Sequence, residues 1–251
     1  MSYFLSGQTL HSGLEFDFSG EEASHLLSSR RTRAGEQFVV QDPQGQRFLA
    51  EVIRVERRQA RVRVLEPVAP PPMPPSSVWL FQAAVKEKAL EFIIQKGTEL
   101  GMAELVVFPS AHSTLPHRAL QNPMNAQRWE RIAWEACKQS DRVSPPGIRT
   151  VPDLSAALAL AATLSPGAGF LLQAGANQTL ARALSELQPT GLQRGAMVRL
   201  LVGPEGGWTP EEVQQAQHAR WDPVRLGHAV LRAETAALAA CTLAVYSHPE
   251  D

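Results

Sequence analysis

The sequence predicts an α/β protein with two domains, and three features lead to this prediction. A proline-rich stretch, residues 67–77, interrupts the chain, and six of its first nine residues are proline. Residues before it alternate between apolar and polar as in β-strands, whereas residues after it switch between apolar runs and helical periodicity. Because a proline run favours extended polyproline II backbone, it acts as a semi-rigid spacer. We therefore expect a small β-rich domain over 1–68, a linker over 69–77 and an α/β domain over 78–251.

Composition places the chain among ordinary globular proteins. It has 251 residues, of which 44% are hydrophobic and 20% charged, which is enough to bury a sizeable core. Its formal charge of -1 gives no global attraction toward nucleic acid, so RNA binding has to use local patches. The N-terminus lacks a signal peptide pattern and no apolar run is long enough to span a bilayer, so we expect a cytoplasmic protein with no membrane partner. Cys137 and Cys241 have no metal-type neighbours in sequence and are interpreted as reduced structural thiols, with no metal site.

The first domain reads as strands around a turn at residues 42–45. Its alternating apolar positions are Phe48, Ala50, Val52, Val62 and Val64. Two groups of arginines stand out, namely Arg54, Arg57, Arg58, Arg61 and Arg63 around the single acid Glu56, and Arg30, Arg31 and Arg33. They are either the solvated face of a sheet or a phosphate-contacting surface on a β-barrel, and the sequence leaves both open.

The second domain alternates strands with helices, which predicts a mostly parallel sheet. The expected strands are 78–85, 104–109, 169–173, 198–202 and 223–227. The expected helices are 86–101, 126–140, 153–163, 177–187, one that begins at Pro210, and 233–246.

The stretch "LLVGPEGGWTPEE", residues 200–212, joins a strand to a helix through a glycine-rich loop. Thr209 and Glu212 predict a capping box with Pro210 at the first helical position, so this helix start already carries its own anionic groups. The loop also lacks the lysine of a Walker motif and the spacing of a dinucleotide fingerprint. These features disfavour a phosphate site, and they leave two interpretations of the loop by itself: a backbone wall for a small ligand at the carboxyl end of a strand, or a tight turn between strand and helix with no ligand.

A second strand, loop and helix follow in "RLGHAVLRAETAALAACTLAVY", residues 225–246. Arg232, Glu234 and Thr235 stand at the mouth of its helix, whose alanines allow another element to pack closely. Two such units at one end of a sheet together favour a ligand pocket, which neither unit does alone.

These motifs resemble a known family. "GPEGG" followed by "LGHAVLRAETA" is similar to the RsmE family of 16S ribosomal RNA uridine N3-methyltransferases, which are SPOUT-class enzymes. "KALEFIIQKGTELG" and "EACKQSDRVSPPGI" look like two further segments of that family, and "HLLSSRRTRAGEQFVVQDPQGQRFLAEV" resembles its N-terminal PUA-like RNA-binding domain.

The resemblance implies a trefoil-knotted SPOUT domain preceded by a PUA-like β-barrel, with S-adenosyl-L-methionine as cofactor. The residues expected to bind this cofactor are Leu172, Gln173, Gly203, Glu205, Gly206, Gly207, Leu226, Gly227, Val230 and Leu231. Arg232 is expected to stabilise negative charge on the uracil carbonyls, and Glu234 to accept the proton or to orient Arg232. The alternative for this pair is a local ion pair that fixes the knot or a dimer interface.

Partners also follow from the resemblance: 16S ribosomal RNA or the small ribosomal subunit, and a second copy of the chain in a homodimer through the knotted domain. Arg30, Arg31, Arg33 and Arg142 are expected to contact RNA. Members commonly carry Ser-Glu-Arg after the second strand, whereas this chain has Ser-Ala-His-Ser at 110–113, so a role of that arginine is lost or passes to a residue such as Arg118. A ribose 2'-O-methyltransferase of the same class and a catalytically silent RNA-binding assembly factor are the competing interpretations.

Overall fold

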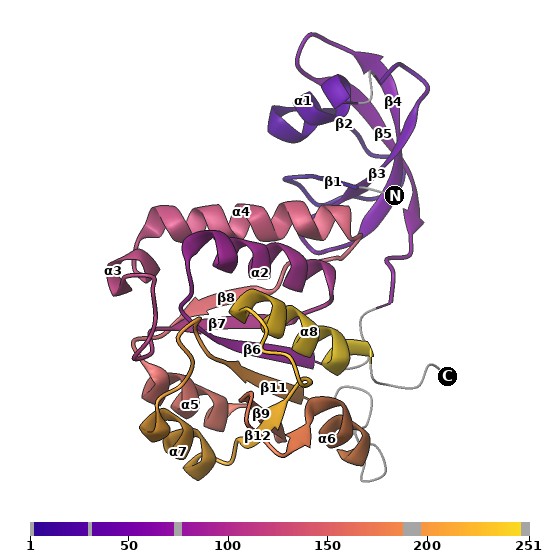
Figure 1. The fold of residues 1–251 in the computed structure, drawn as a ribbon. Helices are drawn as coiled ribbons and strands as arrows, with labels where there is room; N and C mark the ends of the chain where they lie inside the picture. The colour runs from indigo at the N-terminus through magenta and orange to yellow at the C-terminus, as the bar shows by residue number, and fades with distance from the viewer. Residues whose placement is uncertain (1–2, 30–31, 73–76, 188–196, 247–251) are drawn as a thin grey trace. The chain divides into compact units, whose positions relative to one another are not determined.

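The structure is a computed structural model and describes residues 3–29, 32–72, 77–187 and 197–246. The chain divides into two compact units (Figure 1). The small unit comprises Met1–Pro72 and Cys137–Ser144, and the large unit comprises Met73–Ala136 and Pro145–Asp251. The predicted domain limits of 1–68 and 78–251 stay a prediction, and part of the predicted linker, 73–76, lies outside the described residues.

The small unit is built on a curled sheet of five strands in the order β1-β3-β4-β5-β2. Its elements are β1 (Phe4–Leu5), β2 (Glu15–Phe18), α1 (Gly20–Ser29), β3 (Gln37–Gln41), β4 (Arg47–Val55) and β5 (Ala60–Val68). The predicted alternation places Phe48, Ala50 and Val52 of β4 in the core, with Val62 and Val64 of β5 beside them. Since β1 and β2 form the two edges of the sheet, the expected barrel is a half-barrel.

Residues 137–144 group with this sheet because a buried arginine binds them. Arg47 is 4% exposed, and its guanidinium donates to the carboxylate of Asp141 at 2.7 Å and to the carbonyl oxygen of Arg142 at 2.8 Å. The same guanidinium lies 4.0 Å from the centre of the Tyr3 ring. The segment therefore satisfies a charge that the small unit buries.

The large unit contains a seven-stranded, fully parallel sheet in the order β10-β12-β9-β11-β6-β7-β8. Its strands are β6 (Ser77–Ala83), β7 (Glu104–Phe108), β8 (Gly147–Thr150), β9 (Gly167–Leu172), β10 (Gln178–Thr179), β11 (Met197–Val202) and β12 (Asp222–Arg225). The helices are α2 (Glu87–Glu99), α3 (His117–Leu120), α4 (Pro123–Gln139), α5 (Leu154–Thr163), α6 (Leu180–Leu187), α7 (Pro210–His218) and α8 (Ala233–Tyr246), and the end of α4 from Cys137 on belongs to the small unit.

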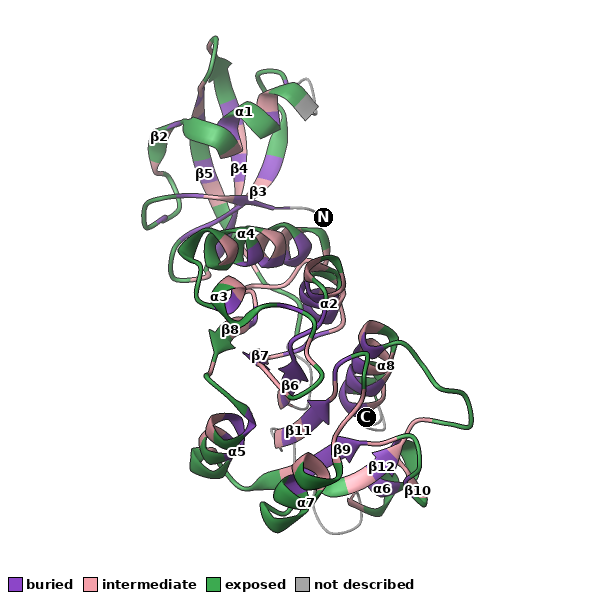
Figure 2. Ribbon diagram, turned by 60° about the vertical axis from the view of Figure 1, so that its left-hand side comes forward, coloured by how far each residue is buried: buried purple, intermediate pink, exposed green. Residues whose placement is uncertain are grey.

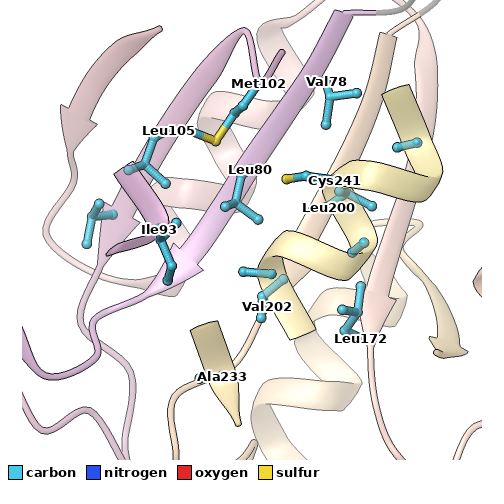
Figure 3. Packing of buried hydrophobic residues seen from close by; sticks show 14 of the residues in the cluster. Val78, Leu80, Ile93, Met102, Leu105, Leu172, Leu200, Val202, Ala233 and Cys241 are labelled. Carbon is cyan, nitrogen blue, oxygen red and sulfur yellow. The ribbon is translucent and has the colours of Figure 1, made fainter. Parts of the chain in front are cut away.

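Helices cover both faces of this sheet, which explains why its central strands read as continuous apolar runs. The buried residues lie mostly on the inner strands and on the helix faces turned toward them (Figure 2). On one face, Val78 and Leu80 of β6 pack with Leu200 of β11 and with Cys241 of α8 (Figure 3). On the other face, Phe81 packs with residues of α5 and with Trp221, which follows α7.

The predicted elements of the large unit are confirmed, with shifts of one to three residues at most ends. The sequence did not predict α1, α3, β1, β2, β8 and β10. Of these, α1 had a readable signal, since Glu21 and Glu22 occupy its first turn and Ala23 and Leu26 are fully buried at helical spacing. β8 and β10 have only four and two residues, which is too short for periodicity to show.

Candidate active site

Three loops meet at one edge of the parallel sheet. β12, β9 and β11 are neighbours, so the loops that follow their carboxyl ends lie side by side (Figure 1). They line an open cavity of about 460 Å³, within the range of small-molecule sites. All residues that the sequence predicts to bind the cofactor lie on these three loops or at the strand end before them.

Most of the predicted cofactor and catalytic residues line this cavity. They are Leu172, Gln173, Gly203, Glu205, Gly207, Leu226, Gly227, Val230, Leu231 and Arg232. The other two, Gly206 and Glu234, do not belong to the lining formed by the described residues. Gly206 instead faces His112, because a Cβ atom on this glycine would lie 2.7 Å from the Cβ atom of His112.

Trp208, in the loop after β11, binds the end of β9, and it is not among the site residues predicted from the sequence. Its indole N–H donates to the carbonyl oxygen of Leu172 at 3.1 Å, and its ring stacks on Phe108. A Cβ atom on Gly203 would lie 3.0 Å from this ring, so glycine at 203 lets the indole pack against the backbone. Its position directly after "GPEGG" is the sequence signal that could have identified it as a site residue.

Gln82, near the end of β6, binds the start of the loop after β11 from inside the sheet. Its side chain is fully buried, and its amide nitrogen donates to the carbonyl oxygens of Ala83, Val202 and Gly203 at 2.9, 3.4 and 3.2 Å. Since it binds the two residues at which β11 ends, it fixes the direction in which the chain leaves the strand.

The glycine loop, residues 203–207, closes as a tight turn. The backbone N–H of Gly207 donates to the carbonyl oxygen of Pro204 at 3.0 Å, and Gly207 has a φ of +71°, which favours glycine. The carboxylate of Glu205 accepts hydrogen bonds from the backbone N–H of Lys86 at 3.2 Å and from the Thr114 hydroxyl at 3.3 Å. Glu205 therefore shapes the loop as well as lining the cavity.

The predicted start of α7 is confirmed. The hydroxyl of Thr209 accepts from the N–H of Glu212, the carboxylate of Glu212 accepts from the N–H of Thr209, and Pro210 occupies the first turn. Glu211 and Glu212 place negative charge at this helix start, which disfavours a bound phosphate there.

The loop between β12 and α8 carries Arg232, the candidate catalytic residue. Arg232 lines the cavity and is exposed, and Glu234 is half-buried at the start of α8. Within the described residues the two side chains form no ion pair with each other, so a local ion pair does not account for them in the single chain. Val230 is 86% exposed, an apolar side chain beside the cavity that the chain alone leaves in solvent.

The arginines of the small unit separate into paired and unpaired groups. Arg61 and Arg63 of β5 face acids of β2, with Arg63 2.7 Å from Glu15 and Arg61 3.3 Å from Asp17. Arg54 pairs with Glu56. In contrast, Arg57 and Arg58, at the turn between β4 and β5, are exposed and meet no acid in the described part of the chain.

The RNA-binding candidates are placed only in part. Arg33 is exposed. Arg142 is half-buried, and its carbonyl oxygen accepts from the Tyr3 hydroxyl at 2.6 Å, so this residue also has a structural role. Arg30 and Arg31 lie outside the described residues.

Two kinds of feature are absent from the described residues. No helix there combines the length and the apolarity that crossing a bilayer requires. Nor do three or more His, Cys, Asp or Glu side chains gather there as metal ligands do. Cys137 and Cys241 are both buried free thiols, as interpreted from the sequence.

The fold and the site define an RNA methyltransferase with a PUA domain. Residues 72–245 match the family model described as an RNA methyltransferase domain, and residues 18–65 match the RNA methyltransferase PUA domain. The chain belongs to the family of ribosomal RNA small subunit methyltransferase E, which confirms the resemblance seen in its motifs.

Three relatives illustrate the match. The Mycobacterium bovis ribosomal RNA small subunit methyltransferase E is 30% identical over 224 residues, which cover 88% of this chain and 82% of that protein. The Bacillus subtilis protein of the same name is 28% identical over 242 residues, covering 96% and 94%. A crystal structure of the Neisseria gonorrhoeae enzyme of this name, bound to S-adenosyl methionine, is 26% identical, covers 96% of this chain and 95% of that one, and has a TM-score of 0.79.

Proposed function

We propose that this protein transfers the methyl group of S-adenosylmethionine to N3 of a uridine in 16S ribosomal RNA. The observation that supports it most directly is the cavity of about 460 Å³ formed by the three adjacent loops, in a chain of the ribosomal RNA small subunit methyltransferase E family. The Neisseria gonorrhoeae relative binds the same cofactor.

The cavity suits a ligand that has both an apolar body and polar edges. Leu172, Val202 and Leu226 supply apolar surface, while the glycine loop brings backbone N–H and carbonyl groups near the ligand. Such groups can read the edge of an adenine. When bound, S-adenosylmethionine supplies an electrophilic methyl group on a sulfonium, and the residues of the three loops orient it toward the base.

Arg232 and Glu234 are the residues we assign to the chemistry. N3 of uridine carries an imide proton that must leave before or during methyl transfer, so negative charge develops on the neighbouring carbonyl oxygens. Arg232, exposed beside the cavity, is suited to stabilise that charge. Glu234 lies two residues further on, outside the lining, and is assigned to accept the proton or to orient Arg232.

The small unit carries the RNA-binding role in this proposal. Its match to the PUA domain supports an RNA substrate, and Arg30, Arg31, Arg33 and Arg142 are the assigned contacts. Replacing Arg30, Arg31 and Arg33 together should weaken RNA binding and flatten its dependence on salt, with cofactor affinity unchanged. If the slope of log K against log salt stays unchanged, these arginines do not contact the RNA.

A trefoil knot and a homodimer through the large unit complete the proposal. The alanines of α8 have a role within one chain, because Ala237, Ala240 and Ala244 are fully buried against the sheet and α2. Tyr246 remains 64% exposed at the end of that helix. Light scattering at micromolar concentration is expected to give the mass of two chains, and a monomer would contradict the dimer.

Mapping methylated nucleotides in 16S ribosomal RNA, with and without the gene, tests the reaction. We expect one 3-methyluridine to disappear on deletion and to return when the wild-type chain is supplied. Loss of a ribose methyl group instead would favour the 2'-O-methyltransferase. Titration calorimetry with S-adenosylmethionine addresses the silent assembly factor, because a chain that binds no cofactor cannot be the proposed enzyme.

A further inference from the structure

The loop after β7 is joined to the glycine loop by contacts that the proposed chemistry does not use. We call residues 110–114 the β7 loop. It closes on itself, since the N–H of Ser110 donates to the Ser113 hydroxyl at 2.9 Å and the N–H of Ser113 donates to the carbonyl oxygen of Ser110 at 3.1 Å. It is therefore a preformed turn.

Hydrogen bonds connect this turn to the glycine loop and to the helix that follows. The Thr114 hydroxyl donates to the Glu205 carboxylate at 3.3 Å, and the N–H of Ala111 donates to the Glu212 carboxylate at 2.9 Å. Nδ1 of His112 lies 3.1 Å from the carbonyl oxygen of Gly207. Since a carbonyl oxygen only accepts, His112 must carry its hydrogen on Nδ1 when this bond forms.

Steric contact adds to these bonds. His112 occupies the space that a side chain at 206 would need, because a Cβ atom there would lie 2.7 Å from the His112 Cβ atom and 3.2 Å from Cγ. Gly206 does not have a positive φ, so its backbone conformation is open to alanine. Close approach of the β7 loop, rather than backbone strain, is therefore the reason for glycine at 206.

A loop with three glycines in five residues needs such support. Glycine loses more conformational freedom on ordering than any other residue. If the glycine loop were free, its ordering on ligand binding would make the free energy of binding less favourable. Contacts from outside fix the loop in advance and lower the cost of binding. Neither His112 nor Thr114 belongs to the cavity lining formed by the described residues.

We propose that the β7 loop positions the glycine loop for cofactor binding, with His112 and Thr114 as positioning residues. The inference rests on the proposed function, because the cofactor is the ligand whose affinity it controls. It predicts a change in the affinity for the cofactor alone, since neither residue itself lines the cavity and neither contacts the catalytic candidates.

The test compares pairs of variants of the full chain. His112→Ala and Thr114→Val remove the donors, while His112→Asn and Thr114→Ser keep one at nearly the same place. One lost hydrogen bond is expected to raise the Kd for S-adenosylmethionine about fivefold, measured by titration calorimetry. His112→Asn and Thr114→Ser should stay within about twofold of wild type. The matched control is His218→Ala, an exposed histidine at the end of α7 that should change nothing.

Kinetics separate positioning from a general loss of structure. In His112→Ala and Thr114→Val the KM for S-adenosylmethionine should rise, whereas kcat at saturating cofactor and the KM for RNA should stay the same. Gly206→Ala should weaken cofactor binding too, and by less in a His112→Gly background, where the two Cβ atoms no longer meet.

Two results overturn the positioning role while leaving the proposed function intact. One is a Kd in both donor-removing variants that equals that of a cofactor-binding wild type. The other is equal loss of affinity in His112→Ala and His112→Asn, which points to packing rather than to the donor. A wild-type chain that binds no S-adenosylmethionine overturns both the inference and the proposed function.

Discussion

The side-chain nitrogen of Gln82 lies 3.2 Å from the carbonyl oxygen of Gly203, so a fully buried amide on β6 holds the first residue of the glycine loop after β11. These two residues are far apart in sequence, but β6 and β11 are hydrogen-bonded neighbours in the sheet. The cavity wall therefore depends on a strand that contributes no residue to the cavity lining among those described.

Replacing Gln82 should weaken both stability and cofactor binding. Gln82→Met keeps the volume but leaves buried carbonyl oxygens without their donor, so we expect a loss of about 1–3 kcal/mol in the free energy of unfolding. Gln82→Glu should lose more, because a carboxylate would face carbonyl oxygens in a buried site. Urea unfolding and titration with S-adenosylmethionine measure the two effects. A Glu variant more stable than the Met variant would contradict this account.

Arg232→Ala should slow methyl transfer with little effect on cofactor binding. If Arg232 stabilises charge on the uracil carbonyls, single-turnover methylation should fall about 10²–10³-fold, as when one preorganised donor is removed from an active site. Arg232→Lys should recover part of the rate, because it keeps the charge but not the planar fork of donors. Normal single-turnover methylation by the Ala variant, with normal cofactor binding, would exclude the catalytic assignment.

The arginines of the β4–β5 hairpin should differ in their effect on RNA binding. Arg57 and Arg58 are exposed and meet no acid in the described ranges, whereas Arg61 and Arg63 face Glu15 and Asp17. If this surface contacts phosphates, Arg57→Ala/Arg58→Ala should reduce the slope of log K against log salt by about 1.4–1.8.

The matched control for this prediction is Arg61→Ala/Arg63→Ala. It removes the same formal charge but also releases acids, so its effect on the slope should be smaller. Filter binding or fluorescence anisotropy with a 16S ribosomal RNA fragment over a range of salt measures both variants. Equal slopes for the two double variants would show that pairing does not decide which arginines reach RNA.

Arg47 should be necessary for the stability of the small unit. Its guanidinium is buried, binds Asp141 and two carbonyl oxygens, and stacks on the Tyr3 ring. The carboxylate of Asp141 is 39% exposed and can bind water when Arg47 is removed, but the carbonyl oxygens of Asp141 and Arg142 lose their donor, so we expect a loss of about 1–3 kcal/mol in the free energy of unfolding. Arg47→Lys should recover little, because one ammonium cannot make the same set of bonds. Urea unfolding tests both, with the exposed Arg57→Ala as control.

Cys241 should contribute to unfolding at alkaline pH. Complete burial raises the pKa of its thiol from 9.0 to about 12, so the folded chain keeps the thiol protonated where the unfolded chain ionises. The contribution to stability is therefore full below about pH 9 and is lost as the pH rises toward 12. At pH 10 the loss should be on the order of 1 kcal/mol relative to pH 7.

Comparing the wild type with Cys241→Ala isolates this thiol. The variant should be less stable at every pH, because it leaves a small void in the core, but its stability should fall less between pH 7 and pH 10. Parallel pH profiles for the two proteins would show that the thiol does not titrate differently in the folded and unfolded chains.

The candidate site was predictable to the extent that it consists of strand ends and the loops after them. Gly203 and Gly207, Leu226 and Arg232 all follow apolar runs, and parallel strands bring their carboxyl ends to one edge. Trp208 was missed although it stands beside "GPEGG". Gln82 and His112, which contact the glycine loop, carry no signal in the sequence. A glutamine in an apolar strand or a histidine in a turn has such a role only if the folded chain brings the loop next to it.

The secondary structure also divides into elements that local sequence predicts and elements that depend on tertiary contacts. Apolar periodicity and the capping residues at Thr209 and Glu212 determine the central strands and helices, because these signals act within one turn or one strand. The edge strands β8 and β10 are too short to carry such a signal, and their place comes from pairing with β7 and β12.

The sequence alone thus determined the two-part α/β organisation, the three loops of the cavity and the family, because local patterns and motifs record them. The tertiary structure decided which arginines of the small unit are neutralised, that Arg47 draws residues 137–144 to the curled sheet, and that the β7 loop lies against Gly206. Each of these depends on the distance between groups remote along the chain, and only the packing of strands and helices sets such distances.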